Sequence, residues 1–194
     1  GLEFIPALAD IDNDSDLDLL IGINNGDLNG NSFFVQNLSA DLENWSAPIW
    51  QRWGIPADSF NSPILATSDL NGDSLPDLLI GEYDGYIYAF RNVQYTIGGK
   101  TLTAWTRESS WDPGINFGNN AAPALGDLDN DGILDLFVGS HGSYGVSPRA
   151  FKNIGTKSAP KWSEQSSWTN TIFFPSYGLE FIPALADIDN DSDL

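Results

Sequence analysis

Three short loops of the sequence carry oxygen-bearing side chains at the same four positions. The loops read DIDNDSDLD, DLNGDSLPD and DLDNDGILD, and they begin at Asp10, Asp69 and Asp127. Aspartate or asparagine stands at positions 1, 3, 5 and 9 of each loop. Alternate positions of a tightly turning loop point inward, and a carbonyl at position 7 with the carboxylate at position 9 can complete a shell of about six or seven oxygens. Such a shell suits Ca²⁺ better than Mg²⁺.

Other kinds of metal site fit these loops less well. Zinc is disfavoured because the chain has no cysteine and a single histidine. An EF-hand begins similarly, but it needs a glutamate at position 12 and flanking helices. Position 12 is here Ile21, Ile80 or Val138, each inside an apolar segment, so the EF-hand is excluded. Solvated acidic turns that bind no metal are the remaining alternative, and three loops in register argue against it.

The three loops are not equivalent as metal sites. The first has an additional carboxylate, Asp16, at position 7. The third has Gly132 at position 6, where a positive φ is easiest for glycine. The second has Asn71 in place of a carboxylate and Ser74 at position 6, so we expect it to be the weakest site.

Acidic residues dominate the charge of the chain, with 27 against 8 basic residues and a formal net charge of −19. This balance disfavours nucleic acid and anionic membranes as partners, and no apolar run approaches the ~20 residues of a membrane helix. Most acids lie in four short clusters, which repel themselves unless a cation is bound. The clusters are Asp10, Asp12, Asp14, Asp16 and Asp18; Asp69, Asp73 and Asp77; Asp127, Asp129, Asp131 and Asp135; and Asp187, Asp189, Asp191 and Asp193.

The flanks of the aspartate loops recur as well, and successive clusters start 59, 58 and 60 residues apart. Each loop lies between two apolar segments such as AAPALGD and LDLFVG, and an aromatic segment and a Trp-bearing segment follow. The pattern therefore predicts four short strands in each repeat. The pair Asp84-Gly85 predicts a hairpin of the I′ type between two of them. No segment has a sustained helical period, so the predicted fold class is all-β.

Stacked four-stranded units of this length are typical of the blades of a β-propeller, with a β-solenoid or an array of sandwiches as the alternative. We predict blades at residues 1–59, 60–116 and 117–177, followed by the start of a next blade at 178–194. The segment 178–194 is identical to residues 1–17, which indicates a repeated unit. A propeller has ~4–8 blades, so three blades need more chain or a second copy to close a ring.

The D-x-[DN]-x-D-x-x-x-D loops between such segments resemble FG-GAP repeats, the related VCBS-type repeats and the integrin alpha-subunit propeller. Phe117-Gly118 and Ala122-Pro123 spell out both halves of the family name. The resemblance covers essentially the whole chain and implies a propeller with a Ca²⁺ loop between the first two strands of each blade. The side-chain ligands that it implies are Asp10, Asp12, Asp14 and Asp18; Asp69, Asn71, Asp73 and Asp77; and Asp127, Asp129, Asp131 and Asp135. The carbonyls of Asp16, Leu75 and Ile133 would join them, and Asp187, Asp189, Asp191 and Asp193 would form an incomplete further site.

Catalysis is not expected of this chain. Most acids already have a metal role, the remaining ones are scattered, and His141 lies in a turn where a solvated side chain is expected. Neither a phosphate-binding loop nor a nucleophile elbow occurs. Trp50, Trp105 and Trp162 recur at equivalent places, which favours packing between blades over stacking on sugars.

These features together predict a non-catalytic, extracellular, Ca²⁺-binding propeller-repeat protein with a structural, adhesion or assembly role. Millimolar external Ca²⁺ would fill even modest sites. The expected partners are copies of the chain itself, with glycans or cell-surface proteins as further partners. Asn37 and Asn44 begin N-glycosylation sequons. The alternatives are a lectin-like propeller that binds glycans in inter-blade pockets and an accessory propeller of a polysaccharide-degrading enzyme.

Overall fold

The structure is a computed structural model, and its described residues form three antiparallel sheets of four strands each, which confirms the all-β class. The described residues are 3–15, 17–24, 31–35, 53–54, 60–97, 100–141, 148–170 and 181–187. Sheet 1 contains β1 (Glu3–Ala9), β2 (Asp18–Asn24), β3 (Asn31–Val35) and β4 (Trp53–Gly54). Sheet 2 contains β5 (Ile64–Ser68), β6 (Asp77–Gly81), β7 (Ile87–Ile97) and β8 (Lys100–Arg107). Sheet 3 contains β9 (Asn119–Gly126), β10 (Asp135–His141), β11 (Arg149–Asn153) and β12 (Trp162–Glu164).

Each sheet is a meander in which strands adjacent in sequence are also neighbours in the sheet. The predicted four strands per repeat are therefore confirmed. The aspartate loop of each repeat joins its first strand to its second, so all three loops connect equivalent pairs of strands. In sheet 1, for example, Ala9 pairs with Asp18 at the two ends of the first loop.

The second strand of sheet 2 is apolar on both faces because it lies between two cores. In sheet 2 all five residues of β6 are buried. Leu78 and Ile80 belong to the apolar core that includes Leu20 of sheet 1, whereas Leu79 belongs to the core that includes Leu136 of sheet 3. Continuous apolar runs are typical of strands covered on both sides, and this packing accounts for the DLLIG sequence.

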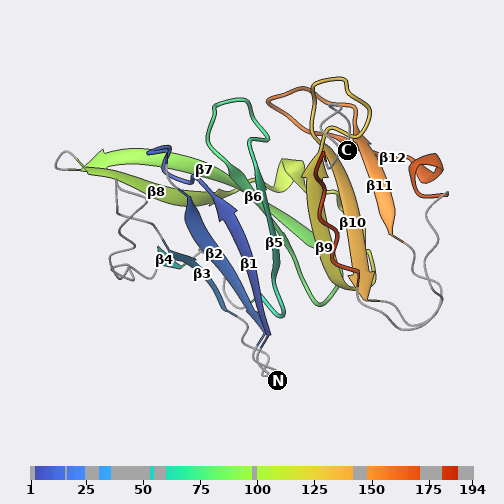
Figure 1. Cartoon of the computed structure of the whole chain (residues 1–194), viewed down its shortest axis with the longest axis horizontal. Coiled ribbons are helices and arrows are strands. Elements are labelled where there is room, and N and C mark those ends of the chain that lie inside the picture. The colour runs from blue at the N-terminus through green and yellow to red at the C-terminus, as the bar shows by residue number, and fades with distance from the viewer. Residues whose placement is uncertain are drawn as a thin grey trace.

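The three sheets stack side by side through their faces (Figure 1), and β5 contacts both β1 and β9. Sheet 2 therefore lies between the other two. Successive four-stranded sheets packed in this way fit a β-propeller-like fold. The blade boundaries at 1–59, 60–116, 117–177 and 178–194 stay predictions.

A glycine near the end of the second strand permits the close approach of neighbouring sheets. A Cβ atom at Gly81 of β6 would lie 1.8 Å from the carbonyl oxygen of Ala121 in β9. A Cβ atom at Gly22 of β2 would lie 2.2 Å from the carbonyl oxygen of Pro63. Any larger residue at these positions must push two sheets apart, which explains why each of these strands carries a glycine after its isoleucine.

The hairpin between β6 and β7 is confirmed, but the predicted I′ turn is wrong. A type I′ turn needs a positive φ at both central residues. The Gly85 N–H donates to the Glu82 carbonyl at 3.0 Å, which places Tyr83 and Asp84 at the centre of the turn. Of the residues in this turn, Gly85 alone has a positive φ, 86°. The connection is therefore the longer hairpin loop, in which a left-handed glycine follows the turn.

Helical structure in the described part of the chain is limited to two 3₁₀ turns, Ser109–Trp111 and Ser166–Trp168. Among these residues no helix is long and apolar enough to cross a membrane. Residues 181–187 belong to no strand, although they lie against β10.

The sheet junction predicts that Gly81→Ala destabilises the protein more than Gly114→Ala. Both substitutions add one methyl group, but a Cβ atom at Gly114 meets nothing within 4 Å and strains only its positive φ of 68°. We expect Gly114→Ala to cost about 1 kcal/mol and Gly81→Ala at least about 2 kcal/mol. Urea unfolding measures both, and equal losses would contradict the close contact between sheets 2 and 3.

Candidate metal-binding loops

The aspartate at position 1 folds each loop around its own side chain. Asp10 Oδ1 accepts a hydrogen bond from the Asp14 N–H at 3.0 Å, and Oδ2 accepts one from the Ser15 N–H at 2.9 Å. Corresponding bonds from positions 5 and 6 reach Asp69 and Asp127 in the other two loops. All three loops therefore turn in the same way.

Positions 4 and 6 of every loop lie in the left-handed region of φ. In the first loop φ is 62° at Asn13 and 76° at Ser15. The equivalent residues are Gly72 and Ser74 in the second loop and Asn130 and Gly132 in the third. The expectation of a positive φ at Gly132 is confirmed, at 79°. Sequence reasoning missed position 4, although asparagine or glycine at that position in every loop is the residue signal for this conformation.

The aspartate at position 9 is a buried bridge between the loop and the sheet. Asp18, Asp77 and Asp135 are each 0% exposed. Oδ2 of each accepts the N–H of position 2 in its loop, at 2.9 to 3.0 Å. Oδ1 of Asp77 also accepts the Asn92 N–H at 2.9 Å, and Oδ1 of Asp135 accepts the Asn153 N–H at 2.8 Å. The asparagine that ends each aromatic segment is the signal for this link, which sequence reasoning missed.

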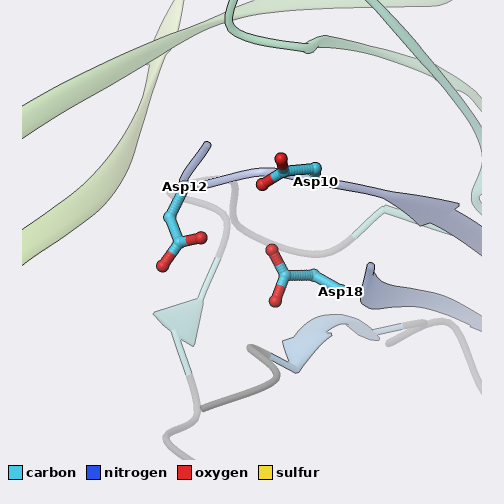
Figure 2. A group of neighbouring side chains, drawn as sticks. All are labelled: Asp10, Asp12 and Asp18. Atoms are coloured by element: carbon cyan, nitrogen blue, oxygen red, sulfur yellow. The ribbon is translucent and has the colours of Figure 1, made fainter. Parts of the chain in front are cut away.

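The carboxylates at positions 1, 3 and 9 converge in two of the loops. Asp10, Asp12 and Asp18 each place an oxygen within 4.8 Å of the others (Figure 2). The oxygens of Asp127, Asp129 and Asp135 form the same group in the third loop. The carboxylates at position 5, Asp14 and Asp131, belong to neither group. Several acidic oxygens facing one another are the donor set that a hard divalent cation binds.

The structure describes only some of the other predicted ligands. The N–H groups at position 7, Leu75 and Ile133, donate to the position-5 carboxylates of their loops at 2.9 Å. Asp187 is described and exposed, but it belongs to no group of converging carboxylates among the described residues. The remaining predictions fall on Asp16, Asp189, Asp191, Asp193, Asn37 and Asn44, which lie outside the described residues.

The second loop presents an amide group where the others present a carboxylate. Asn71 Nδ2 donates to both oxygens of Asp77, at 3.3 and 3.1 Å. Asn71 Oδ1 accepts the Asp73 N–H at 2.9 Å. A metal at this loop must therefore displace a hydrogen-bond donor from the position-9 carboxylate, which fits the expectation that this loop binds most weakly.

The third loop carries a cation of its own, which sequence reasoning missed. The Lys152 ammonium contacts Asp129 and lies 2.8 Å from Oδ2 of Asp131. Hydrogen bonds to these two carboxylates raise the pKa of Lys152 well above its ordinary value, and the bond from Lys152 lowers the pKa of Asp131. Positions 3 and 5 of this loop therefore already attract a positive charge.

Burial has the largest effect on the pKa values of two position-9 carboxylates, Asp77 and Asp135. It raises the pKa of Asp77 to about 7, and the nearby Asp73 and Asp69 add to the effect, while hydrogen bonds from Asn92 and Leu70 oppose it. Burial likewise raises the pKa of Asp135. Ionised carboxylates are costly in such places unless a cation compensates them.

The recurring tryptophans that the structure describes pack inside the fold. Trp105 is 5% exposed, and Trp162 Nε1 donates to the Trp111 carbonyl at 2.7 Å, so both take part in packing. Trp50 and the side chain of His141 lie outside the described residues.

The pKa of Asp77 predicts how the metal-free protein responds to pH. Between the ordinary pKa of 3.8 and the folded value of about 7, the folded state retains a proton that the unfolded state has released. Asp77 alone should therefore make stability fall as pH rises through this range, by at most about 1.4 kcal/mol per pH unit. Urea unfolding after removal of divalent metals measures the slope. Asp77→Asn should reduce it, and an unchanged slope in this variant would contradict the assignment.

Comparisons with known proteins place the chain among repeat proteins. A family model described as FG-GAP-like repeat matches residues 69–138, which include the second and third loops. Integrin alpha-X of Homo sapiens is 25% identical over 150 residues, covering 69% of this chain and 12% of that protein. The chain thus spans a small part of the length of this relative. None of the solved structures matches the chain. The chain contains FG-GAP-like repeats and is similar to an integrin alpha subunit.

Proposed function

We propose that this chain is a non-catalytic Ca²⁺-binding repeat protein in which bound metal stabilises the ends of the sheets. One observation carries the proposal: the carboxylates at positions 1, 3 and 9 converge in the same way in the first and third loops. Asp10, Asp12 and Asp18 would hold one ion, and the equivalent third-loop aspartates another. When bound, Ca²⁺ supplies positive charge and coordination to these oxygens and performs no reaction.

The contacts of the first loop support a structural role for its metal. Asn92 Nδ2 of β7 donates to the Ile11 carbonyl at 2.8 Å, and Gln94 Nε2 donates to the Asp12 carbonyl at 2.6 Å. The loop of sheet 1 is therefore also held by sheet 2. A cation that orders the loop also fixes the carbonyls that the neighbouring sheet binds, so metal binding and sheet packing reinforce each other.

We infer that the protein has a structural, adhesion or assembly role outside the cell. The similarity to integrin alpha-X supports a place outside the cell or at its surface. The net charge of −19 leaves acidic loops that millimolar external Ca²⁺ would neutralise. Sites of modest affinity are sufficient under these conditions.

A lectin-like role is the second candidate, and one cavity favours it. A cavity of about 310 Å³ lies between the second and third loops, at the junction of sheets 2 and 3. Its lining includes Asp69, Asn153 and Lys157, which could donate to or accept from sugar hydroxyl groups. A glycan array separates the candidates: specific binding that Lys157→Ala abolishes would favour the lectin, and no binding would leave the structural role.

Calcium should stabilise the protein by a measurable amount. For sites with a dissociation constant of about 10⁻⁴ M, 10 mM Ca²⁺ adds about 2.7 kcal/mol per site. Thermal unfolding with Ca²⁺, with Mg²⁺ and with a chelator measures the effect, and Mg²⁺ should give less. Asp10→Asn and Asp127→Asn should each remove part of the Ca²⁺ response, whereas Asp84→Asn, in an exposed turn, should keep it. A melting temperature that is independent of Ca²⁺ would overturn the proposal.

The ammonium group in the third loop predicts competition with Ca²⁺. Replacing Lys152 with methionine removes the charge that contacts Asp129 and Asp131. The affinity of the third loop for Ca²⁺ should rise about tenfold or more, while the metal-free protein becomes less stable. Calorimetric titration measures the affinity, with Lys161→Met, an exposed lysine, as the control. Equal affinities in Lys152→Met and the parent chain would show that the ammonium does not compete with the metal.

A further inference from the structure

Residues 181–187 lie on sheet 3 in the way that β9 lies on sheet 2. A Cβ atom at Gly139 of β10 would lie 2.0 Å from the carbonyl oxygen of Phe181, as one at Gly81 would lie 1.8 Å from that of Ala121. The dark red segment runs along sheet 3 in Figure 1. The close contact that joins sheets 2 and 3 is therefore repeated on the far side of sheet 3.

The hydrogen bond beside this contact is also repeated. The Phe181 N–H donates to the Ser140 carbonyl at 3.3 Å, and the Ala121 N–H donates to the Glu82 carbonyl at 3.0 Å. Ser140 and Glu82 each follow the junction glycine of their strand. Residues 181–187 thus take the place of the first strand of a next sheet, although they pair with no second strand among the described residues.

The two copies of one sequence bury opposite faces. In β1, Phe4 is 61% exposed and Leu8 57% exposed, while Ile5 and Ala7 are half-buried. In residues 181–187 the equivalent Phe181 and Leu185 are half-buried on sheet 3, and Ile182 is 51% exposed. The face that β1 leaves open is therefore the face that sheet 3 covers in the other copy.

A strand of this sequence would bury both faces if it had its own sheet on one side and sheet 3 on the other. We propose that β1 of a second copy of this chain docks on sheet 3 in place of residues 181–187. Copies then join head to tail, with sheet 1 of one against sheet 3 of the next. The segment 181–187 is an intramolecular competitor that occupies the acceptor surface of its own chain.

This inference deepens the assembly part of the proposed function and rests on it, but it does not depend on bound metal. The interface is heterologous, because different surfaces of the two copies meet. Two copies that close on each other form a ring of six sheets, and copies that do not close form open chains. Both products have a mass above that of the monomer, so both support the inference.

The test weakens the competitor while keeping the full chain. Leu185→Asp places a charge on the half-buried face of the docked segment, and Ala186→Asp places the same charge on its exposed face. A tethered segment acts at an effective concentration in the millimolar range, so its release should strengthen association strongly. In sedimentation velocity over a concentration series, we expect Leu185→Asp to lower the dissociation constant at least tenfold and Ala186→Asp to leave it within about twofold.

A second pair of variants tests the donor strand. Phe4 and Ile154 are both 61% exposed, but only Phe4 lies on the open face of β1. Added to Leu185→Asp, the change Phe4→Ser should weaken association at least tenfold, and Ile154→Ser should not. If Leu185→Asp does not fold by circular dichroism, the comparison of Phe4→Ser with Ile154→Ser in the otherwise unchanged chain at high concentration still decides the matter.

Two outcomes would overturn the inference: monomers in every variant, or association that Phe4→Ser leaves unchanged. Melting curves with and without Ca²⁺ on the same samples separate its failure from that of the proposed function. A chain stabilised by Ca²⁺ that stays monomeric refutes only the docking of β1. A chain that associates through Phe4 without responding to Ca²⁺ refutes only the metal sites.

Discussion

The rest of the structure depends on a buried carboxylate at the start of the second strand of each sheet. Asp18, Asp77 and Asp135 have no exposed surface, and each accepts an N–H group from the loop in front of it. Burying a carboxylate beside other carboxylates is costly unless hydrogen bonds and a cation compensate it. The loop, the sheet end and the proposed metal site therefore form a single unit, because removing any one of them leaves the buried charge uncompensated.

The three loops are held by different additional contacts, and those of the first loop connect it to the neighbouring sheet. The first loop is held from the neighbouring sheet, where Asn92 and Gln94 bind its carbonyls. In the second loop Asn71 donates directly to the buried carboxylate of Asp77. In the third loop the ammonium group of Lys152 binds Asp129 and Asp131, at positions 3 and 5. A repeat can thus keep its backbone while the source of positive charge or hydrogen bonds varies, and the affinity for metal should vary with it.

The period, the all-β class and the four strands per repeat could be predicted from the sequence because each repeat carries the same pattern of apolar segments and loop aspartates. The same pattern predicts oxygens that converge from positions 1, 3, 5 and 9, whereas the carboxylates that converge in the structure are those at positions 1, 3 and 9. The contact of Lys152 with the third loop could not be predicted, because it joins residues more than 20 positions apart through the pairing of β11 with β10. Nor could the opposite burial of Phe4 and Phe181, since identical sequences differ here only in the sheet that covers them.

The most direct measurement is a crystal structure of the protein grown in Ca²⁺, with anomalous scattering data collected at a long wavelength. The account predicts anomalous peaks in the first and third loops, at about 2.3–2.6 Å from oxygens of Asp10, Asp12 and Asp18 and of their third-loop equivalents. In the third loop the Lys152 ammonium should have moved away from Asp129. Loops that keep the same shape with no anomalous peak, at Ca²⁺ concentrations of several millimolar, would contradict the account.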